Sequence, residues 1–311
     1  MDHTQLNLRN LPYLQRPTGK VRMVLDTDAF NEIDDQFALS YALSIPEKLE
    51  IEAIYAAPFY NILSDSPADG MEKSYQEILR IIPMLKREDL ADKIFRGSVD
   101  YLKDEQTPQD SPAARDLVQR AMAMPEGERL YVVAIGAITN VASALIMEPA
   151  IRDKIVLVWL GGHGYHWPDT QEFNMKQDIA AARVVFGCGI PLVQLPCAGV
   201  VDRFATSKYE LQHWLQGKNA LCDYLYENTV REAESYAAGK PWTRVIWDVT
   251  AVAWLLNTDE KFMKTRLIPS PIPEYDMHYA VNENRHFIRY VYQINRDALF
   301  EDLFRVLVEQ A

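Results

Sequence analysis

Short apolar runs alternate with segments of helical period over more than half of this chain. The segments between the runs carry apolar side chains at three- and four-residue spacing, at 34–43, 70–86, 111–124 and 139–146. The runs are rich in β-branched residues and lack the polar alternation of a strand that faces water: VRMVLD (21–26), IEAIYAA (51–57), RLYVVAI (129–135) and IVLVWLG (155–161). Strands of this kind are covered on both faces. The alternation therefore predicts an α/β fold, a mostly parallel sheet flanked by helices.

The second half of the chain has a different pattern. The segment PLVQLP (191–196) predicts one more strand, and residues 207–257 read as mostly helical. Residues 277–294 predict a β-hairpin, two strands around the polar turn NENR, and residues 297–308 predict a final helix. We find no repeat, low-complexity tract or linker. We expect a single domain over 1–311, with a helical and β-hairpin C-terminal lobe.

Composition excludes several classes of function. The chain has 44 acidic and 32 basic residues, a formal net charge of −12, which repels phosphate backbones and anionic membrane surfaces. We therefore expect neither a nucleic-acid polymer nor a membrane as partner, and no apolar stretch approaches the ~20 residues of a membrane span. The 3 cysteines show no C-x-x-C spacing and are odd in number, which favours a reducing, cytoplasmic location.

An excess of carboxylates stands between the first strand and the first helix of the repeat, in DTDAFNEIDD (26–35). Aspartates are common at helix N-termini, where each stabilises the helix by ~0.3–2 kcal/mol. Capping accounts for one or two of them but not for four, because clustered carboxylates repel one another unless a cation neutralises them or a proton is taken up. Hard ions such as Ca²⁺ bind six to eight oxygen ligands in irregular geometry. The stretch predicts a metal site.

Three further polar clusters follow predicted strands or open a helix. They are AIGAITN (134–140), the loop GGHGYHWPDTQEFN (161–174) and WDVTAVA (247–253). Ligands of an open α/β sheet bind outside the carboxyl ends of its strands, which makes each cluster a candidate. Taken singly, each also has a structural explanation as helix capping or as a solvated loop.

Together these motifs, in this order, resemble the nucleoside hydrolase family of the inosine-uridine-preferring type. The resemblance runs from about residue 21 to residue 256. It implies an α/β protein with a Rossmann-like core that binds one Ca²⁺ ion and hydrolyses the N-glycosidic bond of ribonucleosides. It also implies a homodimer or homotetramer, and a role such as purine salvage.

The resemblance assigns a role to each matching residue. Asp28 corresponds to the general base and a metal ligand, and Asp34 to the aspartate that binds the ribose 2′-hydroxyl. The remaining metal ligands would be Asp35, the Ile135 carbonyl and Asp248. Glu172 and Asn174, in EFN, match the pair that holds the sugar hydroxyls.

The sequence departs from the family pattern at several of these positions. The link AFNEI is two residues longer than usual, which makes Asn31 and Glu32 further candidates for contact with the sugar or the metal. Trp247 replaces a histidine that protonates the leaving base and could instead stack on that base. In AAPFYN (56–61), Asn61 would take the place of a sugar-binding asparagine. His166, six residues before Glu172, replaces another asparagine.

The sequence thus predicts an N-glycosidase that depends on calcium, with Asp28 activating water. The altered leaving-group contacts leave open a purine nucleoside or another ribofuranoside as substrate. A ribose- or nucleoside-binding protein without turnover is the alternative from another class. A haloacid-dehalogenase-like phosphatase fits less well, because Phe30 stands where that family needs threonine or valine.

Overall fold

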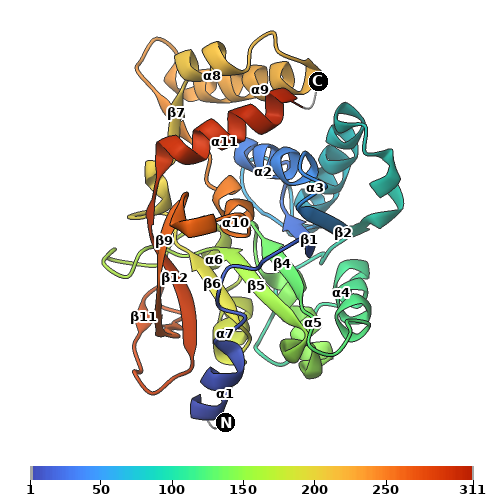
Figure 1. Ribbon diagram of the computed structural model, residues 1–311, viewed down its shortest axis with the longest axis vertical. Helices are drawn as coiled ribbons and strands as arrows, with labels where there is room; N and C mark the ends of the chain where they lie inside the picture. The colour runs from blue at the N-terminus through green and yellow to red at the C-terminus, as the bar shows by residue number, and fades with distance from the viewer. Residues whose placement is uncertain (1–2, 310–311) are drawn as a thin grey trace.

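The computed structural model describes residues 3–309. Its centre is an eight-stranded sheet in the order β3-β2-β1-β4-β5-β6-β12-β9 (Figure 1). Neighbouring strands from β3 to β12 pair in parallel, and only the edge strand β9 is antiparallel to its neighbour. The predicted α/β architecture is confirmed.

The strands of this sheet are β1 (Val21–Thr27), β2 (Leu49–Ala56), β3 (Ile94–Arg96), β4 (Leu130–Ala134), β5 (Ile155–Leu160), β6 (Leu192–Leu195), β9 (Met263–Pro269) and β12 (Phe287–Ile294). Two small two-stranded sheets pair β7 (Ala205–Ser207) with β8 (Thr243–Val245), and β10 (Ile272–Pro273) with β11 (Tyr279–Ala280). The four sheet strands predicted first all form, because their buried apolar runs match the interior of a covered sheet.

The α-helices are α1 (His3–Asn10), α2 (Ile33–Leu43), α3 (Pro67–Ile81), α4 (Pro112–Met122), α5 (Thr139–Met147), α6 (Phe173–Gln177), α7 (Ile179–Gly187), α8 (Lys208–Trp214), α9 (Ala220–Ala237), α10 (Val249–Trp254) and α11 (Arg296–Glu309). Short 3₁₀ helices span Ile82–Leu85, Glu88–Lys93, Pro149–Asp153, Val201–Arg203 and Thr258–Glu260. Helices α8, α9 and α11 lie together at one end of the molecule, and α1 lies at the other (Figure 1).

Two hydrophobic cores cover the two faces of the sheet. Alternate residues of β1 divide between them: Met23 and Leu25 face a core shared with α2, α10 and α11, and Val24 faces a core shared with α4, α5 and α7. In β5, Val158 and Trp159 divide in the same way. This period of two is that of a strand with both faces buried, and it explains the absence of polar alternation in the sequence.

The two strands predicted in residues 277–294 form as β11 and β12, but their pairing with each other in a hairpin is wrong. Strand β12 pairs instead with β9 over seven positions, and β11 forms only two pairs, with β10. The segment 263–269 offers β12 a partner along its whole length, whereas 277–281 ends at Val281, which is 78% exposed. A longer partner satisfies more backbone hydrogen bonds, so β12 pairs with β9 although β11 is closer in the sequence.

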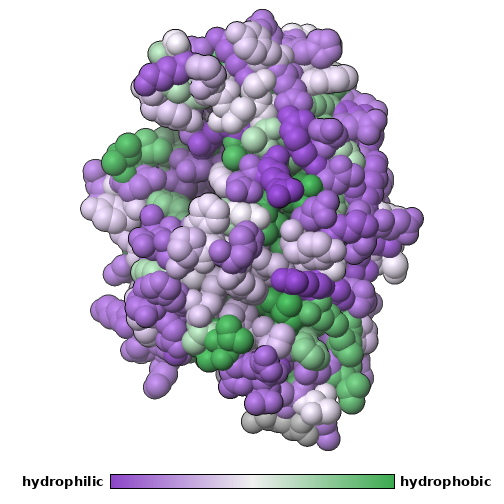
Figure 2. Space-filling model, turned by 90° about the vertical axis from the view of Figure 1, so that its left-hand side faces the viewer, coloured by the Kyte–Doolittle hydropathy of each residue, from purple (hydrophilic) through white to green (hydrophobic). Residues whose placement is uncertain are grey.

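Hydrophilic side chains cover most of the face shown in Figure 2, with hydrophobic ones in smaller patches. Among residues 3–309, no helix combines the length and hydrophobicity that crossing a membrane requires.

A buried histidine gives the fold a dependence on pH. His286 is 1% exposed, and burial lowers its pKa from 6.5 to about 4. Between these values the unfolded chain takes up a proton that the folded chain does not, so stability is complete above pH 6.5 and falls as the pH drops toward 4. The free energy of unfolding should fall between pH 7.5 and pH 5, and we expect His286→Leu to make this fall smaller by about 2 kcal/mol. Urea unfolding at both pH values measures the effect. The exposed His278→Leu serves as control, and an unchanged pH dependence in His286→Leu would contradict this assignment.

Candidate functional site

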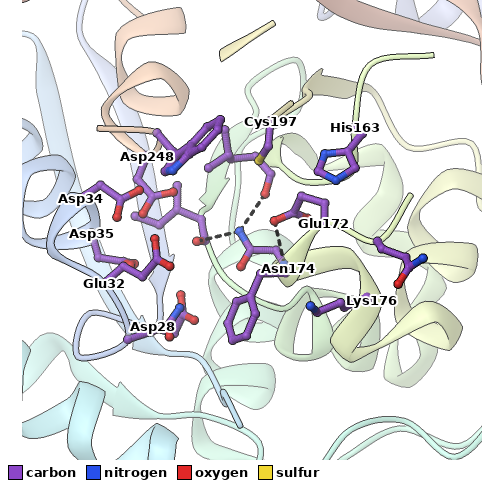
Figure 3. A pocket seen from close by; sticks show the side chains of 16 residues that line it. Asp28, Glu32, Asp34, Asp35, His163, Glu172, Asn174, Lys176, Cys197 and Asp248 are labelled. Atoms are coloured by element: carbon purple, nitrogen blue, oxygen red, sulfur yellow. Dashed lines mark hydrogen bonds between the residues drawn. The ribbon is translucent and has the colours of Figure 1, made fainter. Parts of the chain in front are cut away.

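Four buried aspartates meet at the carboxyl edge of the sheet. Asp28 follows β1, Asp34 and Asp35 stand in the first turn of α2, and Asp248 directly precedes α10. Their exposed fractions are between 1 and 3%. Asp34, Asp35 and Asp248 each offer an oxygen within 4.8 Å of the others. The sequence separated these residues by more than 200 positions, and the fold brings them together (Figure 3).

Burial and mutual repulsion make the charged state of this cluster costly. Burial is the largest cause that raises the pKa of each of the four carboxyls, and neighbouring carboxylates add to it. The pKa of Asp35 rises to about 7, although the Thr27 hydroxyl donates a hydrogen bond to it at 2.5 Å. A cation would remove both penalties at once, since it replaces the lost hydration and offsets the negative charges.

Several oxygens of the cluster have no hydrogen-bond partner within residues 3–309. Both carboxylate oxygens of Asp28 and one of Asp34 are buried and unpaired. Buried polar atoms without partners are rare in proteins and need an explanation such as a bound ion or water. An all-oxygen set with unused acceptors is the donor set that hard divalent cations prefer, so these residues fit a metal ion.

The cluster forms one side of a cavity of about 250 Å³. This is below the ~300–1,000 Å³ typical of small-molecule pockets, so the enclosed part suits a group the size of a sugar. The lining residues are Asp28, Asn31, Glu32, Asp34, Asp35, Ile135, Leu160, His163, Gln171, Glu172, Phe173, Asn174, Lys176, Cys197, Trp247 and Asp248.

The link AFNEI (29–33) supplies part of the cavity wall through Asn31 and Glu32. The N–H of Asn31 donates to the carbonyl of Asp28 at 2.7 Å and closes a turn in this link. Glu32 is held by Arg244, whose Nη2 lies 3.0 Å from the Glu32 carboxylate and 2.9 Å from that of Glu232. Both Asn31 and Glu32 therefore reach the cavity.

Glu172 and Asn174 reach the cavity from the start of α6, but much of their hydrogen-bonding capacity is already used. The Glu172 carboxylate accepts backbone N–H groups of Gly162, Asn174 and Met175, at 2.8–2.9 Å. Burial raises the pKa of Glu172 and these bonds oppose the rise. The Asn174 amide donates to the carbonyl of Ile135 at 3.1 Å, which fixes that carbonyl at the cavity wall.

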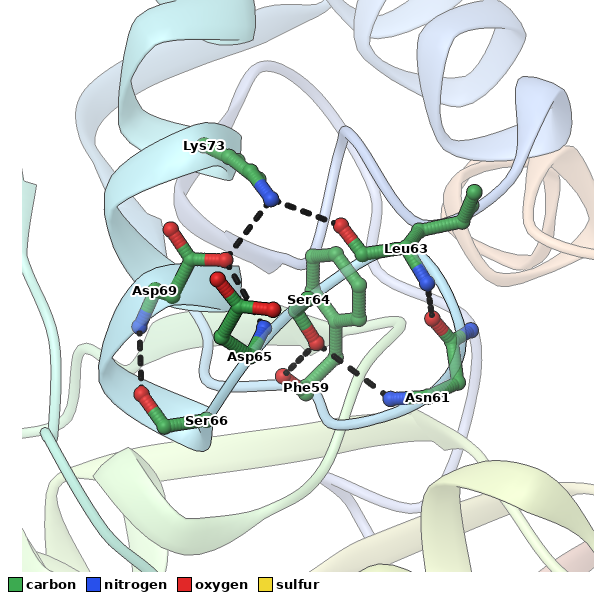
Figure 4. Close-up of polar contacts among 8 residues, drawn as sticks. All are labelled: Phe59, Asn61, Leu63, Ser64, Asp65, Ser66, Asp69 and Lys73. Atoms are coloured by element: carbon green, nitrogen blue, oxygen red, sulfur yellow. Dashed lines mark hydrogen bonds and ion pairs between the residues drawn. The ribbon is translucent and has the colours of Figure 1, made fainter.

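Asn61 does not line this cavity. Its amide donates to the Asn31 side chain at 2.7 Å, and its Oδ1 accepts the N–H of Leu63 at 2.8 Å. Within the surrounding loop, the Ser64 hydroxyl donates a hydrogen bond to the Phe59 carbonyl at 3.0 Å (Figure 4). Lys73 bonds the Leu63 carbonyl at 2.8 Å. Asn61 thus lies outside the cavity and positions the side chain of Asn31, which lines it.

His166 also lies outside the cavity, with an exposed side chain. His163, three residues earlier in the same loop, lines it instead. Sequence reasoning also missed Gln171, Lys176 and Cys197. Their signal was weak, because polar loop residues around EFN are equally typical of a solvated surface.

Trp247 is half-buried and lines the cavity next to Asp248. Its indole packs partly against the core that α10 shares with the sheet. A partly exposed aromatic face at a cavity wall can contact a flat ligand group.

The comparisons with known proteins agree with one another. The model of the family described as "Inosine-uridine preferring nucleoside hydrolase" matches residues 23–300. A pyrimidine-specific ribonucleoside hydrolase, RihA, of Salmonella typhi is 29% identical over 195 residues. That match spans 55% of this chain and 58% of the relative, so only a little over half of the relative's length is covered.

Solved structures share the fold at low identity. A plant nucleoside hydrolase, PpNRh1, has a TM-score of 0.71 at 19% identity, covering 94% of this chain and 99% of its own. A purine-preferring ribonucleoside hydrolase from Gardnerella vaginalis has a TM-score of 0.70 at 20% identity, covering 93% and 98%.

Proposed function

The chain belongs to the inosine-uridine preferring nucleoside hydrolase family, and we propose that it hydrolyses the N-glycosidic bond of a ribonucleoside or a related ribofuranoside. The observation that carries the proposal is the cluster of four buried aspartates, with unpaired oxygens, inside a cavity of sugar size. The named relatives differ in the base that they act on. The leaving group of this chain's substrate therefore has to be determined on the protein itself.

Calcium is the metal that we propose for the cluster. Asp28, Asp35, Asp248 and the Ile135 carbonyl would hold it, and Asp34 lies close enough to Asp35 and Asp248 to be a further ligand. When bound, the ion would supply positive charge that offsets the carboxylates and orients a water molecule and the sugar's vicinal hydroxyls.

The side chains of the cavity account for the chemical step. Asp28, with both oxygens unpaired, accepts a proton from water as the water attacks the anomeric carbon. Asp34 and Asp248 accept the 2′- and 3′-hydroxyls and thereby fix the ring. The surrounding carboxylates favour the positive charge that develops on the sugar in an oxocarbenium-like transition state. Direct attack by water predicts inversion at the anomeric carbon.

Metal removal tests this proposal. We expect a chelator to abolish the release of base from inosine and uridine, and added Ca²⁺ to restore it, because without the cation the carboxylates repel one another. Full activity in the chelated protein would contradict the proposed metal. Mg²⁺ added at the same concentration is the control for ion identity, because Mg²⁺ demands near-octahedral geometry.

Trp247 is proposed to stack on the leaving group. We expect Trp247→Ala to weaken binding of a purine nucleoside by roughly two- to tenfold, in line with the ~0.5–1.5 kcal/mol of an aromatic pair, and to leave ribose binding nearly unchanged. Calorimetric titration with inosine and with ribose measures the two effects. An equal loss for both ligands would rule out stacking.

A further inference from the structure

The cavity has two ends of opposite hydrogen-bonding character. Carboxylates, which only accept, occupy the end formed by β1, α2 and α10. The opposite end is lined by nitrogen-bearing side chains of the segment between β5 and α7, among them His163, Gln171 and Lys176. One carboxylate, that of Glu172, also lies there, but it already accepts three backbone N–H groups. Figure 3 shows His163 and Lys176 across the cavity from Asp34 and Asp35. In a chain of net charge −12, this grouping of donors marks a distinct subsite.

The hydrogen bonding of His163 makes its ring a donor toward the cavity. The backbone N–H of Ala198 donates to Nδ1 of His163 at 3.2 Å. A nitrogen that accepts carries no proton, so the neutral ring carries its proton on Nε2. Partial burial lowers the pKa of His163, which favours this neutral form at pH 7. The ring of Trp167, with its centroid 5.8 Å away, packs against the imidazole and supports its orientation.

Lys176 supplies a positive charge beside this donor. Within residues 3–309, no carboxylate forms an ion pair with the Lys176 ammonium group. Its close neighbour Glu172 is already bonded to three backbone N–H groups. The ammonium lies 5.6 Å from the centroid of the Phe173 ring, another lining residue, and no carboxylate competes for it, so it can bind an anionic ligand.

We propose that the substrate carries an anionic group, a phosphate or a carboxylate, that binds to His163 and Lys176 while its vicinal hydroxyls face the aspartates. This inference rests on the proposed hydrolysis. The anion could be a phosphate ester on the exocyclic C5′ oxygen or a carboxylate on the leaving base. In either case the oxygen of water adds to C1′ and the C1′–N bond breaks. One proton of the water passes to Asp28, the leaving base takes a proton from solvent, and Asp28 returns its proton to solvent, so that one water molecule is consumed.

Paired substrates test the proposal. Inosine 5′-monophosphate is compared with inosine, and orotidine with uridine, by kcat/KM in the presence of Ca²⁺. In one of the two pairs, we expect kcat/KM of the anionic substrate to be roughly ten- to hundredfold higher than that of its neutral counterpart, the range of a charge-assisted hydrogen bond. The pair that shows the preference identifies where the anion is attached.

Variants assign the preference to the subsite. We expect Lys176→Met to reduce the ratio of anionic to neutral kcat/KM at least tenfold, and His163→Phe to reduce it further. Lys264 lies on the edge strand β9, outside the cavity. Lys264→Met is therefore the control and should leave the ratio of anionic to neutral kcat/KM unchanged.

Two results would overturn the inference while leaving the proposed function intact. One is hydrolysis of inosine or uridine with no preference for either anionic substrate. The other is a preference that survives in both Lys176→Met and His163→Phe. Absence of hydrolysis for these four ribosides and for a wider panel of ribofuranosides would instead refute the proposed function itself.

Discussion

Asp35→Asn should lower turnover of any substrate riboside by about 10³-fold or more, and should abolish calorimetric calcium binding. Asp35 is one of three carboxylates whose oxygens lie within 4.8 Å of one another, and it is held by the Thr27 hydroxyl. Loss of one ligand charge weakens the site, and a positioned cation contributes several kcal/mol to a charged transition state. The change preserves the shape of the side chain.

The fold of the Asp35→Asn protein should remain intact. In the absence of calcium, we expect this variant to be at least as stable as the metal-free protein of natural sequence, because one of four mutually repelling carboxylates has lost its charge. Added calcium should raise the melting temperature of the natural protein but not of the variant. Asp92→Asn, at an exposed position, is the matched control. Unchanged calcium affinity in Asp35→Asn would remove Asp35 from the metal site.

Asp28→Asn should reduce kcat by about 10²–10⁴-fold, the range contributed by a general base. Both oxygens of this carboxylate are buried and lack a partner within residues 3–309, and Asp28 is outside the tightest group of three carboxylates. An amide cannot accept the proton of water in the same way. We therefore expect the variant to lose turnover while it still binds ribose.

Two measurements separate this role from a role in metal binding alone. Ribose affinity in the presence of calcium should change by less than tenfold in Asp28→Asn, whereas it should fall steeply in Asp35→Asn. If a saturating calcium concentration restored kcat in Asp28→Asn, Asp28 would act as a metal ligand only and not also as the base.

The sheet and the aspartate cluster were predictable because their physical causes are local in the sequence. Strands buried on both faces need long apolar runs: β5 is apolar throughout, and β1 is apolar over Met23, Val24 and Leu25 at its centre. Parallel strands place their carboxyl ends at one edge, so Asp28 and the loop after β5 had to approach each other. Asp248 could be assigned to the same cluster only from the order of the motifs that this chain shares with a known family.

Other features depended on contacts between distant segments. The sequence did not predict the pairing of β12 with β9, because the polar turn NENR suggested that β12 pairs with the segment just before that turn. Counting back from Glu172 selected His166, but the path of the loop brings His163 to the cavity. Asn61 was expected at the sugar, yet its side chain is committed to Asn31 and Leu63. In each case a hydrogen bond or chain path that residue spacing does not encode decided the outcome.

The link AFNEI (29–33), which the family resemblance predicts to be two residues longer than usual, joins the cavity wall to other parts of the fold. Through Arg244, Glu32 is tied to Glu232 of α9, and through Asn61, Asn31 is tied to the loop after β2. The extra residues thus connect the cavity wall to two elements beyond the metal site. We infer that the link adjusts the cavity wall without adding a ligand of its own to the proposed set.

The most direct measurement is release of free ribose or ribose phosphate from a panel of ribosides, with calcium present, in water enriched in ¹⁸O. The account predicts base and sugar in equal amounts, with one ¹⁸O atom at C1 of the sugar and none in the base. Binding of ribosides without any release of base would contradict it, and so would a released base that carries oxygen from water.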